Sequence, residues 1–331
     1  MKPSALRHSL FVALTALLAI VPVTAQDGER RDPQAAFSDR IDVARVIFDV
    51  RVVDGMNRPI EGLTPSDFRV RLGGERAVVE AVDWIDEEAE AEWFRDTVAG
   101  RLGAEAAARL QPPAPRVVFF FQANLQPLAA TGHLRVLPHL QEVAHELPQS
   151  TLAAVVAFDS HLELHQDFTR DRDAVAEAMY RGHGYFRSEW PVPPENGPSL
   201  ARHLDHGRAL EIAFAEDAVA AVAHALAAEP GPSSIVFVGW SLEDDDAMID
   251  ALVAARTQFH ALDVVHPDTR DHPGREVAQV ENLVTSGYYR LTVVREPLST
   301  TRPRLEVTMR DWTRFQRVLH PEILELRPEA R

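Results

Sequence analysis

The stretch PRVVFFFQANLQPL, Pro115 to Leu128, decides the fold prediction. The apolar run Val117 to Phe121 is typical of a strand that is covered on both faces. A loop rich in amides follows, with Gln122, Asn124 and Gln126 at alternate positions. Such a strand predicts side-chain oxygens at the carboxyl edge of a sheet, which is where doubly wound α/β domains bind ligands.

The pattern after this stretch alternates between strands and helices. Further apolar strands are predicted at 152–158, 234–239, 259–265 and 288–294, and helices at 133–147, 208–228, 245–255 and 276–285. The alternating segment 161–166 is predicted as an edge hairpin partner. Together these segments predict an α/β domain at 115–295 with a doubly wound, mostly parallel sheet.

The flanking segments have a different character. Residues 41–88 alternate apolar and polar side chains between Gly and Pro turns, which predicts a small β-sandwich-like domain. Residues 89–114 are rich in Ala and Glu and end in PPAP, so we expect a helical linker. The segment 296–331 is predicted to be a β-rich extension.

The N-terminus has the features of a targeting segment. Lys2 and Arg7 precede the short apolar run Leu10–Val21, and Val23-Thr24-Ala25 fits a signal-peptidase site. We expect cleavage of a signal peptide, 1–25, ahead of a flexible linker, 26–40. The mature protein is then expected to be soluble and periplasmic or secreted. An uncleaved signal anchor is the alternative.

The composition of the chain argues against several classes of binding partner and of side-chain chemistry. The net charge of −16 disfavours nucleic acid and anionic membranes. The absence of cysteine excludes disulfides and thiolate chemistry.

Two separated pieces of sequence resemble one protein family. The first is VVDGMNRPIEGLTPSDFRVRLGGE, Val52–Glu75. The second is the order PRVVFFFQANL, LAAVVAFDSHLELHQDFTRD, SSIVFVGWSLED and SGYYRLTV. Together they resemble exported bacterial proteins, of a type common in acidobacteria, that carry a von Willebrand factor A-like domain. The resemblance covers most of residues 41–320.

The resemblance implies a metal-ion-dependent adhesion site at the loop after the first strand. The family's pattern there is D-x-S-x-S, whereas this chain has Gln122, Asn124 and Gln126. No acid stands at Gly239-Trp240-Ser241, where the family has a further aspartate. Neutral amide oxygens hold Mg²⁺ poorly without carboxylates. We therefore expect a degenerate metal site and no cofactor.

Two further sets of residues allow catalytic or metal-site interpretations. Ser241, with Asp268 and His272 after it, has the chain order of a serine hydrolase, but Glu243 replaces the last glycine of the G-x-S-x-G motif. Alternatively, Ser241 caps a helix that begins near Glu243. His161, Glu163 and His165 share one side of a strand and could bind zinc, or they form the solvated face of an edge strand.

An aromatic loop suggests a partner-binding surface. Tyr185, Phe186 and Trp190 lie in a predicted insertion, 181–206, and could anchor a protein partner or fold back as a lid. These observations predict an exported, non-enzymatic protein-binding or adhesion-type protein. The alternatives are a hydrolase that uses Ser241 and a structural periplasmic module without a ligand site.

Overall fold

The computed structural model describes residues 44–321 and 324, apart from 124–125, 185–186, 188, 241, 244, 296–299, 301 and 311–315. The expected signal peptide and flexible linker lie outside these residues. The chain divides into the units Met1–Ile41 and Asp42–Arg331, and the description below concerns the second. Within the described residues, no helix combines the length and the apolar character that a membrane crossing requires.

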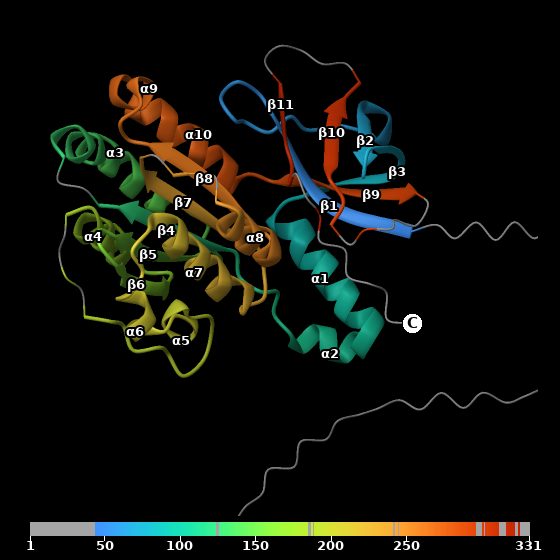
Figure 1. Ribbon diagram of the computed structural model, residues 1–331. Helices are drawn as coiled ribbons and strands as arrows, with labels where there is room; N and C mark the ends of the chain where they lie inside the picture. The colour runs from blue at the N-terminus through green and yellow to red at the C-terminus, as the bar shows by residue number, and fades with distance from the viewer. Residues whose placement is uncertain are drawn as a thin grey trace, which may run out of the picture. The chain divides into compact units, whose positions relative to one another are not determined.

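Strand β4, from the first half of the Pro115–Leu128 stretch, is the central strand of a five-stranded sheet with the order β6-β5-β4-β7-β8 (Figure 1). Strands β5, β4, β7 and β8 are parallel, and β6 pairs with β5 in the antiparallel direction at one edge. The predictions of a mostly parallel sheet and of an edge hairpin are therefore confirmed. The bounds are β4 (Arg116–Gln122), β5 (Leu152–Phe158), β6 (Leu162–Thr169), β7 (Ser233–Gly239) and β8 (Thr257–Asp263).

Both faces of this sheet are covered by helices, as the continuous apolar run of β4 requires. Phe119 and Phe121 pack with α3, α4 and α10 in one core, and Val118 and Phe120 pack with α5, α7 and α8 in the other. The helices are α3 (Pro127–Glu146), α4 (Arg172–Gly182), α5 (Leu200–His203), α6 (His206–Ala209), α7 (Ala215–Ala227), α8 (Asp246–Ala255), α9 (Pro267–Asp271) and α10 (Pro273–Thr285).

A second, six-stranded sheet joins the two ends of the described chain. Its order is β10-β2-β3-β9-β1-β11. Its strands are β1 (Ala44–Val53), β2 (Phe68–Leu72), β3 (Glu75–Ile85), β9 (Tyr288–Arg295), β10 (Leu305–Met309) and β11 (Arg317–Leu319). The α/β part is thus inserted between β3 and β9, after the helices α1 (Glu87–Leu102) and α2 (Ala104–Arg109) of the predicted linker.

The position of β9 corrects the sequence interpretation, which put this strand in the parallel sheet. It lies between β3 and β1 and is antiparallel to both. The physical reason is its alternation: Tyr289, Leu291 and Val293 are buried on one face, while Arg290 and Thr292 lie on the other. One-sided burial is typical of antiparallel sheets, whereas strands of a doubly wound sheet are apolar throughout.

The DGMNRP turn after β1 is held by its own polar side chains. The Asp54 carboxylate accepts hydrogen bonds from the Met56 N–H (2.8 Å) and the Arg58 N–H (3.0 Å). Asn57 has a positive φ of 58°, a conformation that asparagine tolerates better than most residues. The Asn57 amide donates to the Gln279 carbonyl of α10 (3.1 Å), so the turn also contacts the α/β part.

The GLTPSD segment is tied to β9 by a buried tyrosine. The Tyr289 hydroxyl donates to the Ile60 carbonyl (2.8 Å) and accepts from the Leu63 N–H (3.1 Å). The next helical turn is capped by Thr64 and Asp67. In this region, the residues that carry the family resemblance therefore stabilise turns and tie them to β9.

We predict that Tyr289→Phe lowers the free energy of unfolding by about 1–3 kcal/mol, because it leaves a partly buried carbonyl and N–H without a partner. Denaturant unfolding measures the loss. Thr308→Val, which removes a hydroxyl at an exposed position of β10, is the control and should change stability far less. Equal effects of the two substitutions would contradict the assigned role of the Tyr289 hydroxyl.

Candidate functional site

The carboxyl edge of β4 is joined to that of β7 by a side-chain amide. Gln122 Oε1 accepts a hydrogen bond from the Trp240 N–H at 2.9 Å. A Cβ at Gly239 would lie 2.6 Å from Gln122 Oε1, so a residue with a side chain does not fit there without a shift. Gln122 therefore connects the two strand ends at the edge where the sequence predicts a ligand site.

This arrangement differs from that of a metal site. The Gln122 oxygen that a cation would need is directed at a backbone N–H, and no carboxylate stands at Gly239 or Trp240. Asn124 lies outside the described residues, and Gln126 directly precedes α3. The described residues contain no group of three His, Asp or Glu side chains that could hold a metal ion.

The buried residue His133 contacts both Gln122 and Trp240 at this edge of the sheet. His133 Nε2 lies 3.0 Å from the Gln122 carbonyl oxygen and donates to it, and the ring packs edge-on against Trp240. Burial, with a smaller contribution from the nearby His183, lowers the pKa of His133 to about 4, so the imidazole is neutral at pH 7. The ring therefore acts as a neutral packing group and hydrogen-bond donor.

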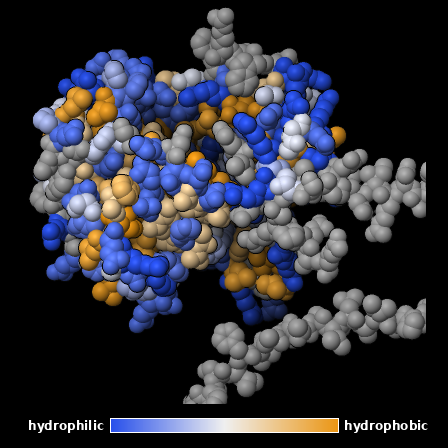
Figure 2. Space-filling model, viewed as in Figure 1, coloured by the Kyte–Doolittle hydropathy of each residue, from blue (hydrophilic) through white to orange (hydrophobic). Residues whose placement is uncertain are grey.

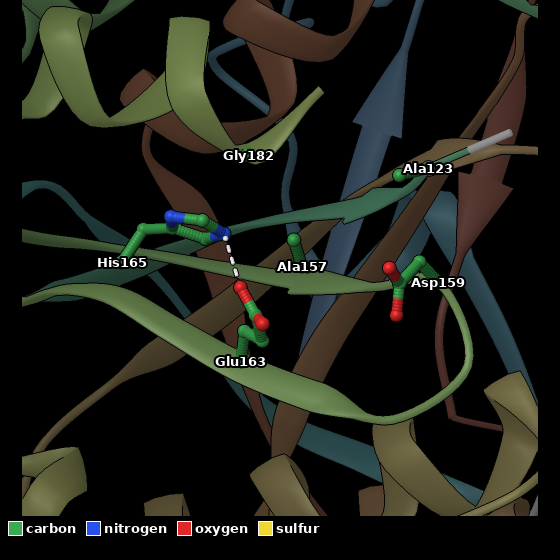
Figure 3. Close-up of a pocket in the computed structure, with 6 residues that line it drawn as sticks. All are labelled: Ala123, Ala157, Asp159, Glu163, His165 and Gly182. Carbon is green, nitrogen blue, oxygen red and sulfur yellow. Dashed lines mark ion pairs between the residues drawn. The ribbon is translucent and has the colours of Figure 1, made fainter. Parts of the chain in front are cut away.

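A pocket opens beside this edge, between the end of β4, the β5–β6 hairpin and the end of α4 (Figure 3). It is shallow and open to solvent, with a cavity volume of about 10 Å³, which is room for about one water molecule. It is lined by Ala123, Ala157, Asp159, Glu163, His165 and Gly182. Asp159 was missed in the sequence interpretation, although an acid directly after a buried strand is a signal for a ligand site.

The structure brings His161, Glu163 and His165 together. His161 Nε2 lies 3.0 Å from Glu163 Oε1, and His165 Nε2 lies 3.5 Å from Glu163 Oε2. The expectation of a solvated strand face is wrong for this set, because the His165 side chain is buried and the other two are largely covered. The hairpin packs against α4, which buries this side of the edge strand.

The predicted insertion is anchored by a buried carboxylate. The Ser199 hydroxyl donates to Asp167 Oδ2 (2.5 Å), and the Leu200 N–H donates to Asp167 Oδ1 (2.7 Å). Glu229, after α7, accepts from the Ser199 N–H (3.2 Å) and lies 2.9 Å from His203 Nε2. The segment is thus fixed to β6 and α7.

The aromatic residues predicted as partner anchors fall into two groups. Trp190 stacks on the His206 ring (4.6 Å between centroids) and packs against the α7 side of the core. Tyr185 and Phe186 lie outside the described residues. The same segment exposes Val192 (88%), Leu210 (52%) and Phe214 (66%). In Figure 2 the visible face is largely hydrophilic, with apolar residues in small groups.

The predicted hydrolase site is described only in part. Ser241 lies outside the described residues, so its distances to Asp268 and His272 stay unassigned. The expectation that Ser241 caps a helix starting near Glu243 is wrong. Helix α8 begins at Asp246, and Asp245 caps it by accepting from the Met248 N–H (2.8 Å). A carboxylate at the N-cap is also favoured by the helix dipole.

Comparison with known proteins gives only distant likenesses. No family model and no curated protein matches the sequence. A von Willebrand factor type A protein from Catenulispora acidiphila is similar at 11% identity and a TM-score of 0.32, over 89% of this chain and 76% of that one.

Two pilus proteins give similar values. The three N-terminal domains of the type V pili tip protein Mfa5 from Porphyromonas gingivalis are 10% identical (TM-score 0.26), over 60% of this chain and 26% of that one. A point mutant of the PilB minor pilin from Streptococcus sanguinis is 9% identical (TM-score 0.29), over 53% and 64%. This chain thus spans less than two thirds of either pilus structure, and likenesses at these values carry no argument about function.

We predict that Gln122→Leu lowers the free energy of unfolding by about 1–3 kcal/mol, because the Trp240 N–H loses its acceptor at a partly buried position. Denaturant unfolding is the measurement. Gln149→Leu, at an exposed loop position, serves as the control and should stay within about 0.5 kcal/mol of the native protein. A Gln122→Leu protein as stable as the control would show that the amide bond does not support this edge.

We also predict that acid destabilises this edge through His133. Its folded-state pKa of about 4 is below the unfolded value of 6.5, so the unfolded chain binds more protons as pH falls between these values. Stability is therefore lost as pH falls, by at most about 1.4 kcal/mol per pH unit. His133→Gln keeps a donor for the Gln122 carbonyl and should flatten the dependence of unfolding free energy on pH across this window. Gln149→Leu, which changes no titratable group and lies at an exposed position, should leave the slope unchanged.

Proposed function

We propose that this chain is an exported, non-catalytic protein-binding module of the von Willebrand factor A-like type, whose metal site has been lost. The observation that carries the proposal is the anchored segment between α4 and α7, which exposes Val192, Leu210 and Phe214. Large apolar side chains on a segment fixed by buried polar contacts are typical of a protein-binding surface.

The anchoring makes this segment suited to binding. Asp167 is buried and accepts hydrogen bonds from both Ser199 and Leu200, and Glu229 holds the same turn from the other side. A surface that is already ordered loses less conformational entropy when a partner binds. More of the free energy gained by burying these apolar side chains against a partner is therefore available for affinity.

The carboxyl edge of β4 supports a metal-independent mode of binding. In the resembling family, a bound cation takes an acidic residue of the partner. In this chain, the Gln122 oxygen is engaged by Trp240, and the neighbouring amides offer no charge to offset a divalent cation. Recognition by direct side-chain contact fits these residues better than recognition through a metal.

Capture of the partner by the mature protein tests the proposal. We expect a specific partner to be captured equally well with chelator and with millimolar Mg²⁺. Val192→Asp and Phe214→Asp should each weaken capture about ten-fold or more, because a buried charge disrupts an apolar contact. Leu134→Asp, at an exposed position of α3, is the matched control and should leave capture unchanged.

Three results would contradict the proposal. Capture that requires Mg²⁺ would restore the metal-dependent mode. Capture that survives both substitutions would place the surface elsewhere. Failure to retain any specific partner would favour the structural module without a ligand site.

A further inference from the structure

We propose that the proline-rich run 190–195, WPVPPE, is displayed as a rigid polyproline II segment, and that the protein partner receives it in a groove lined by aromatic side chains. The inference rests on the proposed protein-binding function and names the part of the anchored segment that a partner recognises. The run lies between α4 and α5.

The sequence of the run restricts its backbone conformation. The pyrrolidine ring holds φ at about −65° in Pro191, Pro193 and Pro194. A residue that precedes proline is kept out of the α region, which applies to Trp190, Val192 and Pro193. Polyproline II satisfies all of these limits at once. The structure agrees, because these residues form no helix, strand or hydrogen-bonded turn.

Both ends of the run are held by the protein. Trp190 stacks on the His206 ring at 4.6 Å between centroids and packs against the core on the α7 side. At the other end, Arg202 of α5 donates to the Pro194 carbonyl (2.5 Å) and to the Gly197 carbonyl (2.7 Å). The run is therefore ordered before a partner arrives.

The middle of the run is exposed and offers hydrogen-bond acceptors. Val192 is 88% exposed, and Pro193 and Pro194 are exposed as well. Among the described residues, none donates a hydrogen bond to the carbonyl of Pro191, Val192 or Pro193. Proline has no N–H, so Val192 carries the single backbone donor of residues 191–194. A partner that binds here has to donate hydrogen bonds and to cover apolar rings.

These requirements select an aromatic groove. Trp and Tyr combine an apolar ring with an N–H or O–H donor, so one side chain can pack on a proline ring and donate to a carbonyl. Aromatic-lined grooves bind proline-rich segments because the ligand conformation is formed in advance and loses little entropy. A partner that adds a strand is disfavoured, since strand pairing needs the N–H groups that proline lacks.

The three-residue period of polyproline II indicates which side chains reach the groove. Pro191 and Pro194 share one edge, and Arg202 ties this edge to the protein. Val192 and Glu195 share another edge, and both are exposed. Glu195 thus places a carboxylate beside the apolar Val192, so an Arg or Lys at the end of the partner's groove is its complement.

Calorimetric titration of the purified partner with the mature protein tests the inference. The probe for the run alone is the synthetic peptide EWPVPPENG, residues 189–197, whose prolines impose the conformation locally. We expect this peptide to displace the mature protein from the partner. The peptide EWAVAAENG, in which alanine replaces each proline, should not displace it.

Variants of the full chain test the backbone conformation. Pro193→Ala should weaken binding about five-fold or more, because it frees φ and removes a ring from the contact. Val192→Pro should keep the affinity within about two-fold, because proline fits the same conformation and the Val192 N–H is not used. Pro138→Ala, at an exposed proline of α3, is the matched control and should bind like the native protein.

A charge reversal tests the predicted basic end of the groove. Glu195→Arg should weaken binding about two- to five-fold, which is the range expected for an exposed ion pair. Glu92→Arg makes the same change at an exposed position of α1 and should leave the affinity unchanged.

Photo-cross-linking locates the groove on the partner. A benzophenone side chain at position 192 of the mature protein is cross-linked to the bound partner, and the product is mapped by mass spectrometry. We expect cross-links beside Trp or Tyr residues. Cross-links to a surface without aromatic side chains would overturn the inference. So would native affinity of Pro193→Ala, or loss of binding in Val192→Pro, which would indicate strand pairing.

The inference and the proposed function fail in different ways. If capture depends on Phe214 but ignores Pro193→Ala and the peptide, the inference is wrong and the proposed function stands. If the mature protein captures no specific partner, the proposed function fails and the inference fails with it.

Discussion

The hydrogen bond from the Trp240 N–H to Gln122 Oε1 is the contact on which the carboxyl edge of the parallel sheet depends. β4 and β7 are neighbours, and the chain leaves both strands at this edge. A backbone N–H beyond the end of a strand has no ladder partner, and a partly buried one needs an acceptor. Gln122 supplies that acceptor, and Gly239 leaves the space that the amide occupies. Gln122 Oε1 is thus engaged in a structural hydrogen bond, and as a neutral amide oxygen it offers no charge to offset a divalent cation.

The polar groups left at this edge lie beside β4 rather than at its end. The β5–β6 hairpin carries Asp159, His161 and Glu163, and α4 covers them from one side. On the other face, Asp167 and Glu229 fix the segment that exposes Val192 and Phe214. The acidic side chains of the hairpin and the apolar side chains of the anchored segment therefore lie on separate surfaces of the α/β part.

Much of the α/β part was predictable because its strands are unusually clear. Val117–Phe121 and Ser234–Gly239 are continuous apolar runs, and the structure places both in the centre of the sheet. The prediction placed β9 in the parallel sheet because this strand follows the other strands of that sheet along the chain. Its buried and exposed residues alternate, however, and this pattern is typical of the antiparallel sheet that it joins. Pairing between strands at opposite ends of the described chain, such as Phe48 with Leu291, leaves no local signal in the sequence.

The site was predictable in its position at the sheet edge but not in its contacts. The amide side chain at position 122 was visible in the sequence, whereas the bond from Gln122 to Trp240 depends on how two distant strand ends meet. The burial of His165 was equally hidden, since it results from the packing of α4 on β6. Composition and periodicity identify elements and edges, but the partners of individual polar atoms follow from the packed structure.

Amide hydrogen exchange at Trp240 tests the central claim most directly. The mature, chelator-treated protein would be measured by NMR with and without about 10 mM Mg²⁺, a level that saturates even a weak site. The account predicts that the Trp240 N–H is protected to a degree similar to the N–H groups of β7, and that Mg²⁺ leaves its exchange rate unchanged. Exchange as fast as that of an exposed loop amide, or a rate that changes when Mg²⁺ is added, would contradict it.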